Sequence, residues 1–354
     1  MPHSVINALG VLDNPNLLMH PGDPDRSALA YGSTATAVDA RALADARAAG
    51  VSAVNVTLGH VAGSADPYEA TRRDIAAWDD FIARHPHALR LVRTGSDFDA
   101  AHAAGQVGVI YGFQNTEMLG RDPARVDEFA GLGVRVIQLT YNGRNAVADG
   151  ATVADDRGLS AFGAEVVERL EAQRVLVDLS HSSEKTCLDA LRQARRPLAI
   201  THTACRALAD HPRNKSDAEL RLLAERGGVV GLYFMPNLLL AGQPLAADLV
   251  AHLEHALQVC GEDHVGLGTD GGTTAPDDLA AYRARLADEV ETRRRLGIGA
   301  PGETADVVCF LPDLCGPSQF ERLAALLAAR GHGEARIAKI LGGNFRRLMR
   351  ECWN

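Results

Sequence analysis

Short apolar runs rich in β-branched residues alternate along the chain with longer amphipathic stretches rich in Ala, Leu and Arg. The short runs predict buried strands and the long stretches predict crossover helices, an alternation typical of a parallel sheet. Strands are predicted at residues 4–9, 53–58, 107–113, 134–139, 175–179, 198–201, 228–234 and 264–267. Helices are predicted at residues 37–49, 66–85, 122–132, 160–173, 183–195, 217–226 and 245–260.

Eight strand–helix units without an internal sequence repeat favour a (β/α)8 TIM barrel formed as one domain from residues 1–354. The alternative is a doubly wound open sheet. No strand is followed by GxGxxG or by a phosphate-binding loop, so nothing supports a nucleotide-binding sheet of that kind.

Two connections are longer than a minimal barrel needs, namely residues 15–36 after the first strand and residues 271–317 after the eighth. Both follow the carboxyl ends of strands, where barrel enzymes place their active sites. We therefore expect walls of a substrate pocket or contacts between subunits, and plain surface insertions are the alternative.

Composition narrows the class of partner. Hydrophobic residues make up 46% and charged residues 23% of the chain, as in a soluble globular protein with a large core. The net charge of −9, without a Lys/Arg cluster, argues against nucleic acid or an anionic membrane and favours a small molecule.

Residues 1–10 lack the pattern of a secretory leader, and no segment is apolar for long enough to span a bilayer. These two observations predict a cytoplasmic protein. The six cysteines include no CxxC pair, which favours free thiols over disulfides or a thiolate zinc site.

Polar side chains follow three of the predicted strands. His181 follows residues 175–179, His202 follows residues 198–201, and Asp270 follows residues 264–267. Two imidazoles on adjacent strands with an acid nearby predict a Zn²⁺ site, where the metal can lower the pKa of a water molecule to roughly 7. Asp270 would then take the proton of the water and pass it to the leaving amine.

Five runs resemble consecutive signatures of the renal (membrane) dipeptidase family of metallopeptidases. They are GLSAFG at residues 158–163, LVDLSH at 176–181, HPRNKSD at 211–217, VGLGTD at 265–270 and GGNF at 342–345. Their order and spacing agree with the family over nearly the whole chain. The resemblance implies an amidohydrolase-type barrel that hydrolyses dipeptides with two zinc ions.

Carried over residue by residue, the resemblance implies that His181 and His202 bind one zinc ion and that Asp270 is the catalytic acid and base. Arg213 would hold the carboxylate of the substrate through parallel hydrogen bonds, with an exposed rim arginine as the alternative. Asn142 and Asn214, which stand beside two of the predicted site residues, are expected to contact the substrate as well.

Departures from the family pattern lie at the same pocket. The first strand of the family ends in Asp-Gly-His-Asn-Asp, but residues 7–11 here read NALGV, so Leu9 and Val11 offer no metal ligand. Gln114 stands where the family has a bridging glutamate, and Tyr141 where it has a histidine that polarises the substrate carbonyl. We expect one zinc ion per chain on His181, His202 and Gln114, with Tyr141 donating to the oxyanion.

The expected function is that of a dipeptidase-like hydrolase cleaving an amide bond in a dipeptide or an N-acyl amino acid. Two alternatives stay open: another reaction on a small carboxylate, such as lyase or isomerase chemistry, and a metal-free binding protein without catalysis. The expected partner is a small molecule with a free carboxylate, and a homodimer is the expected assembly.

Overall fold

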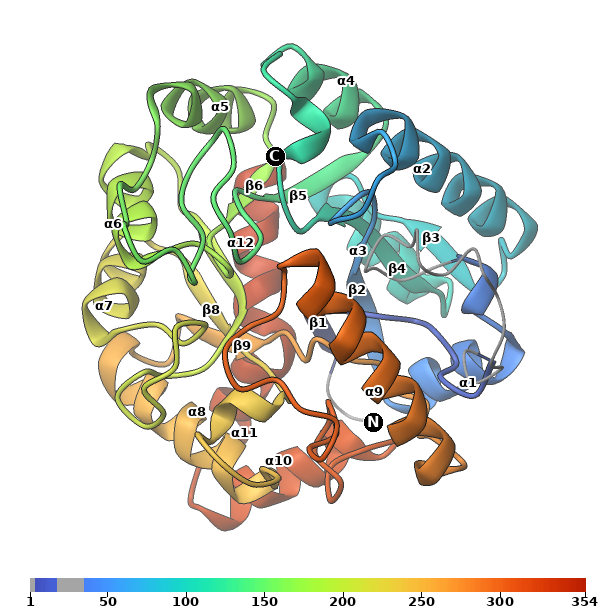
Figure 1. The fold of residues 1–354 in the computed structure, drawn as a ribbon. Helices are drawn as coiled ribbons and strands as arrows, with labels where there is room; N and C mark the ends of the chain where they lie inside the picture. Colours follow the sequence, from blue (N-terminus) through green and yellow to red (C-terminus); the bar gives the residue numbers. More distant parts are fainter. Residues whose placement is uncertain (1–3, 18–34) are drawn as a thin grey trace.

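The computed structural model describes residues 4–17 and 35–354, and its centre is a nearly closed barrel of parallel strands (Figure 1). The strand order along the barrel is β1-β2-β4-β5-β6-β7-β8-β9. These strands are β1 (Val5–Gly10), β2 (Val51–Thr57), β4 (Val107–Phe113), β5 (Val134–Gln138), β6 (Leu176–Asp178), β7 (Ala199–Thr203), β8 (Val229–Leu232) and β9 (Val265–Leu267). Each predicted strand overlaps one of them, which confirms the predicted barrel.

β1 and β9 stand at the two ends of the strand order, and hydrogen bonds outside a regular ladder close the seam between them. The Asn7 side chain donates to Thr269 Oγ1 at 2.8 Å and accepts from the Thr269 amide at 2.8 Å. Further along, the amide of Asp270 donates to the carbonyl of Leu9 at 3.0 Å. The first strand therefore fixes the main chain of the segment that carries Asp270.

Helices surround the strands as predicted (Figure 1). They are α1 (Ala40–Ala48), α2 (Pro67–Arg84), α4 (Arg125–Gly131), α5 (Ala161–Ala172), α6 (Glu184–Gln193), α7 (Asp217–Glu225) and α8 (Ala246–Cys260). Side-chain oxygens cap several of their first turns, including those of Ser160, Ser183 and Ser216. These caps explain why the predicted boundaries lie close to the observed ones.

The predictions did not include β3 (Leu89–Leu91), α3 (Gly95–Ala103) or the four α-helices that follow β9 and are described below. β3 is three residues long and pairs only with β4, outside the barrel path. α3 reads GSDFDAAHA and has one large apolar side chain, Phe98, so its periodicity is weak. Short turns complete the outline: η3 (Ala35–Ala37), η4 (Glu117–Leu119), η5 (Pro236–Leu238) and the π-helical η6 (Lys339–Gly343).

Helix α12 (Asn344–Trp353) closes the amino-terminal end of the barrel, preceded by α10 (Gln319–Ala329) and α11 (Glu334–Ala338). Its buried face forms one apolar cluster with the inward residues Ile6, Ile110 and Val136 of the strands. Trp353 also stacks on Phe98 of α3 with ring centroids 5.7 Å apart. The amino-terminal end of the barrel is thus filled by apolar side chains, and the accessible opening lies at the carboxyl ends of the strands.

The long segment after β9 contains α9 (Leu279–Leu296), which crosses in front of the barrel in Figure 1. Most of the other predicted insertion, residues 15–36, lies outside the described residues. The described helices include none with the length and apolar character needed to traverse a bilayer. The six cysteines are free, as predicted.

Candidate active site

A cavity of about 1340 Å³ lies at the carboxyl ends of the strands. Six of the predicted site residues line it: Gln114, Tyr141, Asn142, His181, Arg213 and Asp270. His202 and Asn214 are fully buried beside this wall. The ring of His202 lies 5.0 Å from that of His181, and Asn214 accepts a hydrogen bond from the cavity residue Tyr233.

The proton position on His181 follows from its neighbour Asn142. The Asn142 amide nitrogen donates to the carbonyl of Ile298 at 2.7 Å, so its oxygen Oδ1 faces Nδ1 of His181, also at 2.7 Å. An amide oxygen can only accept, so Nδ1 carries the proton and Nε2 carries a lone pair. Nε2 of His181 is buried and has no hydrogen-bond partner.

The same argument applies to His202 through a second chain of hydrogen bonds. Thr201 gives its hydroxyl proton to Asp178 Oδ2 at 2.6 Å, so its oxygen accepts from Nδ1 of His202 at 3.0 Å. Burial raises the pKa of Asp178, although hydrogen bonds from Ser180 and Thr201 oppose this rise. Nε2 of His202 therefore carries a lone pair, and it too is buried without a partner.

The two imidazoles are suited to hold a metal ion. Burial, reinforced by the charge of Arg213, lowers the pKa of His181 and of His202 well below the usual value, so both rings are neutral. Metal ligation requires neutral imidazole. A buried nitrogen without a partner is destabilising, and neighbouring imidazole lone pairs are what Zn²⁺ accepts.

A second metal ion does not fit the residues present. Gln114 can offer one neutral oxygen, because its amide nitrogen is used in a 2.7 Å bond to Thr57. Leu9 and Val11 offer no donor atom. The described part of the chain contains no group of three or more His, Cys, Asp or Glu side chains placed to bind a metal. His181, His202 and Gln114 together offer two imidazole nitrogens and one amide oxygen, which are donor atoms for a single ion.

Asp270 lies just beyond the end of β9, whereas His181 follows β6 and His202 lies in β7. Its φ of 56° is in the left-handed region, which Asp adopts more readily than most residues. Burial raises the pKa of its carboxyl to about 6, while Arg213 and Arg293 act in the opposite direction. A carboxyl group with a pKa close to neutrality can accept a proton and return it.

Arg213 is 3% exposed, and one of its guanidinium nitrogens donates to the carbonyl of Ser180. Burial lowers its pKa, yet arginine keeps its charge in proteins. Asp270 and Asp178 act on its charge from nearby, but no ion pair joins Arg213 to an acidic side chain among the described residues. A buried arginine that lines a cavity without an acid partner is suited to bind a carboxylate of the substrate.

Asn214 supports the loop of Arg213 instead of facing the cavity. Its amide nitrogen donates to the carbonyls of Ala209 at 2.8 Å and Asn237 at 2.9 Å, and its oxygen accepts from the hydroxyl of Tyr233. These bonds occupy the polar groups of the side chain. In this structure Asn214 therefore supports the loop of Arg213, and its direct contact with substrate stays a prediction.

Tyr141 packs flat against His181, with ring centroids 4.2 Å apart and an interplanar angle of 21°. Its hydroxyl oxygen accepts a hydrogen bond of 3.0 Å from Arg293. Because arginine only donates, this bond leaves the phenolic proton of Tyr141 available to a group in the cavity.

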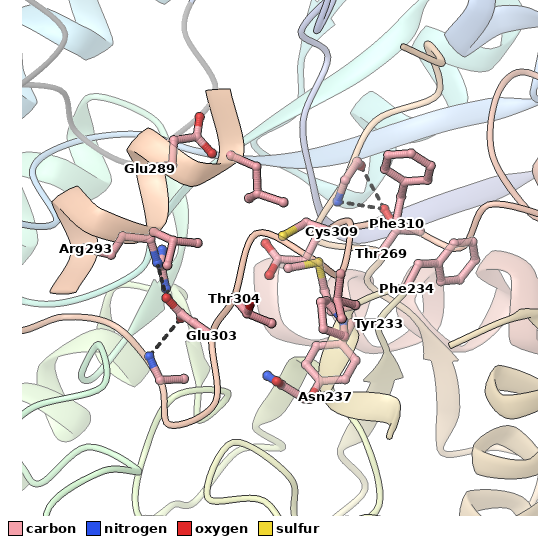
Figure 2. A pocket seen from close by; sticks show the side chains of 18 of the residues that line it. Tyr233, Phe234, Asn237, Thr269, Glu289, Arg293, Glu303, Thr304, Cys309 and Phe310 are labelled. Carbon is pink, nitrogen blue, oxygen red and sulfur yellow. Dashed lines mark hydrogen bonds and ion pairs between the residues drawn. The ribbon is translucent and has the colours of Figure 1, made fainter. Parts of the chain in front are cut away.

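Sequence reasoning missed Arg293 and its partner Glu303, which Figure 2 shows at the cavity. Arg293 lies on α9 and forms two hydrogen bonds with Glu303, at 2.9 and 2.8 Å. It is the first of three consecutive arginines, and its neighbour Arg294 points outward with 74% of its side chain exposed. The sequence contains no signal that distinguishes these arginines.

Apolar side chains form another part of the cavity wall. Tyr233 and Phe234 follow the end of β8, and Phe310 comes from the loop after α9 (Figure 2). Leu286 of α9 lines the cavity as well. The segment of residues 271–317 is thus a pocket wall, one of its two predicted roles. This wall suits an apolar portion of a ligand.

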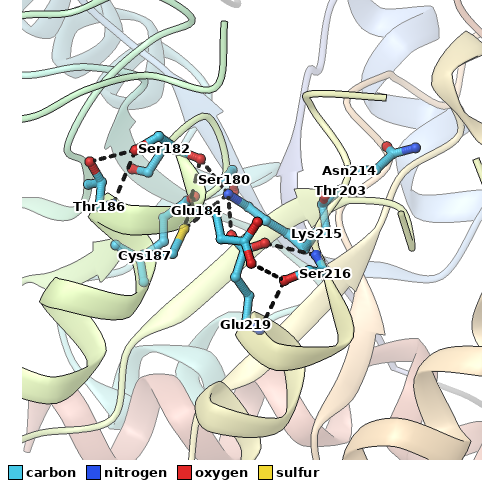
Figure 3. Close-up of polar contacts among 12 residues, drawn as sticks. Ser180, Ser182, Glu184, Thr186, Cys187, Thr203, Asn214, Lys215, Ser216 and Glu219 are labelled. Carbon is cyan, nitrogen blue, oxygen red and sulfur yellow. Dashed lines mark hydrogen bonds and ion pairs between the residues drawn. The ribbon is translucent and has the colours of Figure 1, made fainter. Parts of the chain in front are cut away.

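A buried charged cluster supports the loops behind the site (Figure 3). Lys215 and Glu219 form an ion pair at 3.3 Å with side-chain exposures of 1% and 0%. Lys215 Nζ also donates to the carbonyl of Ser182 at 2.6 Å and contacts Cys187 Sγ at 3.0 Å. The ion pair therefore anchors the residue that follows His181 to helix α7.

The barrel, with His181, His202, Asp270 and Arg213 at its mouth, defines a hydrolase of the amidohydrolase type. Comparison with known families makes this more specific. The chain belongs to the membrane dipeptidase family (peptidase family M19), whose model matches residues 13–296. The predicted family and class of enzyme are thereby confirmed. The match begins two residues after Val11, so the altered end of β1 lies outside it.

Individual relatives agree with this assignment. An uncharacterised Klebsiella pneumoniae protein encoded in the pqqA 5′ region is 27% identical over 81% of this chain and 98% of its own length. Dipeptidase verJ of Clonostachys rogersoniana is 30% identical over 57% of this chain, and the match spans about half (52%) of that dipeptidase. An amidohydrolase structure from Pseudomonas aeruginosa has a TM-score of 0.78 and 26% identity, covering 99% of this chain and 97% of its own.

Proposed function

We propose that the protein is a metal-dependent hydrolase that cleaves the amide bond of a dipeptide or an N-acyl amino acid with one zinc ion per chain. The observation that carries this proposal is the pair of buried, neutral imidazoles, each with an unpartnered Nε2, in His181 and His202. Gln114 would complete the ligand set. When bound there, zinc would supply Lewis acidity to the carbonyl and to the attacking water.

Three other side chains bind the substrate, transfer the proton and stabilise the developing negative charge. Arg213 binds the free carboxylate of the substrate and so sets the position of the amide bond. Asp270 removes a proton from the attacking water and returns it to the leaving amine. Tyr141 donates its phenolic proton in a hydrogen bond to the carbonyl oxygen as negative charge develops. The apolar wall supports an apolar group on the acyl side of the substrate.

Metal content tests the ligand assignment. Elemental analysis of the purified protein is expected to give about one zinc per chain, lost in His181→Ala and in His202→Ala. His264→Ala is the matched control, because its ring bonds to the carbonyl of Gly228 at the opposite end of the barrel. Two zinc ions in the wild type would show that the reading of Leu9, Val11 and Gln114 is wrong.

An amide screen tests the reaction. We expect hydrolysis of dipeptides or N-acyl amino acids that carry a free carboxylate, and loss of hydrolysis when that carboxylate is amidated. Bound metal without amide hydrolysis would favour another reaction on a small carboxylate. Ligand binding that is independent of His181, without metal, would favour a binding protein. The cytoplasmic location and the homodimer stay predictions.

A further inference from the structure

Helix α9 and the loop after it are tied to the active site at three points. Asn142 donates to the carbonyl of Ile298 at 2.7 Å, and Nε2 of His211 lies 2.9 Å from the carbonyl of Pro301. The third tie is the 3.0 Å bond from Arg293 to the hydroxyl of Tyr141. Two of these ties reach neighbours in sequence, Tyr141 and Asn142, and both of those side chains contact the ring of His181.

Arg293 itself is held firmly from behind (Figure 2). Two parallel hydrogen bonds join its guanidinium to Glu303, and the amide of Ala300 donates to Glu303 Oε1 at 2.8 Å. A fork-shaped pair of this kind fixes both the place and the orientation of the guanidinium. The nitrogen that faces Tyr141 is therefore fixed relative to the cavity.

The direction of the bond between Arg293 and Tyr141 decides its chemical effect. The arginine donates and the phenol oxygen accepts, so the phenolic hydrogen is not used in this contact. A donor bound to a hydroxyl oxygen polarises the hydroxyl and makes it a stronger donor in turn. Stacking on His181 at 4.2 Å keeps the hydroxyl beside the metal-binding imidazole.

We propose that Arg293 is a positioning residue for the hydrolysis, acting through Tyr141 to orient and strengthen the hydrogen bond that stabilises the negatively charged carbonyl oxygen. This inference rests on the proposed function. It assigns a role to the segment after β9 beyond forming a wall. Glu303 supports that role by holding the arginine. Arg293 contacts Tyr141 and not the substrate, so its positive charge acts through the hydrogen bond to Tyr141.

The kinetic test uses Tyr141→Phe, Arg293→Gln, Arg293→Lys and the double variant Tyr141→Phe/Arg293→Gln. Tyr141→Phe is expected to lower kcat by about 100-fold with little change in KM, the loss typical of one oxyanion donor. Arg293→Gln should lower kcat by about tenfold or more, and Arg293→Lys should recover part of that loss. The double variant should be no slower than Tyr141→Phe alone, because the arginine acts through the tyrosine. Arg294→Gln, on the outer face of the same helix, is the matched control.

A binding measurement separates this inference from the proposed function. A phosphinate analogue of a dipeptide carries a charged oxygen on a tetrahedral centre, so calorimetry with this probe reports the oxyanion contact without turnover. We expect a similar fall in affinity of about tenfold or more in Tyr141→Phe and Arg293→Gln, without a further fall in the double variant. Affinity for an amino acid, bound through its carboxylate, should not change.

Independent, multiplying losses in the double variant would overturn the role of Arg293, as would wild-type behaviour of Arg293→Gln in both assays. If the wild type hydrolyses no amide yet the phosphinate affinities fall as expected, the proposed function fails and the oxyanion contact stands. If the wild type neither hydrolyses an amide nor binds the phosphinate, both are overturned. Melting temperatures identify any variant whose loss reflects unfolding.

Discussion

Asn142 holds His181 through a single hydrogen bond of 2.7 Å that fixes which ring nitrogen carries the proton. Partners of this kind behind a metal ligand typically change metal affinity by 10- to 100-fold. Asn142→Leu is therefore expected to weaken zinc binding by roughly that factor. Asn142→Asp should bind zinc nearly as well, because it keeps an oxygen that accepts from the imidazole. Competition with a zinc-binding dye would measure both, and equal affinities for Asn142→Leu and the wild type would contradict the assignment.

Activity should depend on the ionisation of Asp270. Burial raises the pKa of this carboxyl to about 6, and only the ionised form accepts the proton of water. We expect kcat/KM to increase tenfold per pH unit below about pH 6 and to level off above it. Asp270→Asn should lower kcat by about 10²- to 10⁴-fold, whereas Asp306→Asn, at an exposed carboxylate of the same cavity, should stay near the wild type. A profile that is flat between pH 5 and 7 would count against this role.

The Lys215–Glu219 ion pair should be costly to break. Burial would raise the pKa of Glu219, but Lys215 and the amide of Ser216 bring it below the usual value, so both partners are charged. Glu219→Gln leaves a buried ammonium group unpaired and should lower the free energy of unfolding by about 3–5 kcal/mol. Replacing both residues, as in Lys215→Met/Glu219→Gln, should recover part of this loss.

The exposed pair of Arg221 and Asp217 on the same helix provides the control for that experiment. The Arg221 side chain is 58% exposed and lies 3.4 Å from the Asp217 carboxylate. Arg221→Gln should change the free energy of unfolding by less than about 1 kcal/mol. Urea unfolding of the three variants and the wild type gives the comparison. A loss in Glu219→Gln no larger than that in Arg221→Gln would refute the ion-pair argument.

Asp74 should make the fold less stable as pH rises. Burial raises the pKa of this carboxyl from 3.8 to about 6, so the folded state holds the proton more tightly than the unfolded state does. Stability from this group is therefore present below about pH 4 and declines up to about pH 6, by roughly 2 kcal/mol after allowance for partial exposure. Asp74→Asn should remove this decline and raise the free energy of unfolding at pH 7.5.

Unfolding in urea at pH 4 and pH 7.5 would measure this difference. The Asn side chain can still accept from the amide of Gly59, which donates to Asp74 at 2.8 Å. Asp80→Asn, on an exposed position of the same helix, should leave the pH dependence unchanged. If the free energy of unfolding of Asp74→Asn declined with pH as that of the wild type does, the pH dependence would arise from another group.

The missing half of the family's metal site should be restorable. Leu9→His, Val11→Asp and Gln114→Glu together supply an imidazole and two carboxylates at the ends of β1 and β4. We expect the metal content to rise from about one to about two zinc ions per chain, because carboxylate and imidazole are ligands of Zn²⁺. Leu9→His alone should stay at about one. If the zinc content of the triple variant did not rise, the prediction that Leu9, Val11 and Gln114 prevent binding of a second ion would be contradicted.

The barrel was predictable because its eight strands are apolar runs followed by polar residues, and each run is long enough to be visible. β3 escaped prediction because it reads LRL, with a charged residue at its centre, and α3 escaped because it has a single large apolar side chain. His181, His202, Asp270 and Arg213 were found through strand ends and family-like motifs. Arg293 and Glu303 were not, because their roles arise from contacts across a loop that has no regular spacing.

The contacts of the Asn214 side chain could not be predicted from the sequence either. It stands next to Arg213, and adjacency suggested a shared ligand, but the chain direction turns its amide toward the carbonyls of Ala209 and Asn237. The tautomers of the two histidines likewise depend on groups distant in sequence. Asn142 is 39 residues from His181.

The seam between β1 and β9 positions Asp270 without relying on the side chains of Leu9 and Val11. The carbonyl of Leu9 and the amide of Val11 bond to the amide of Asp270 and the carbonyl of Gly271, at 3.0 and 3.3 Å. Main-chain atoms make both contacts, so they do not depend on which side chains occupy positions 9 and 11. Exchanging the side chains at positions 9 and 11 therefore leaves intact the main-chain hydrogen bonds that position Asp270.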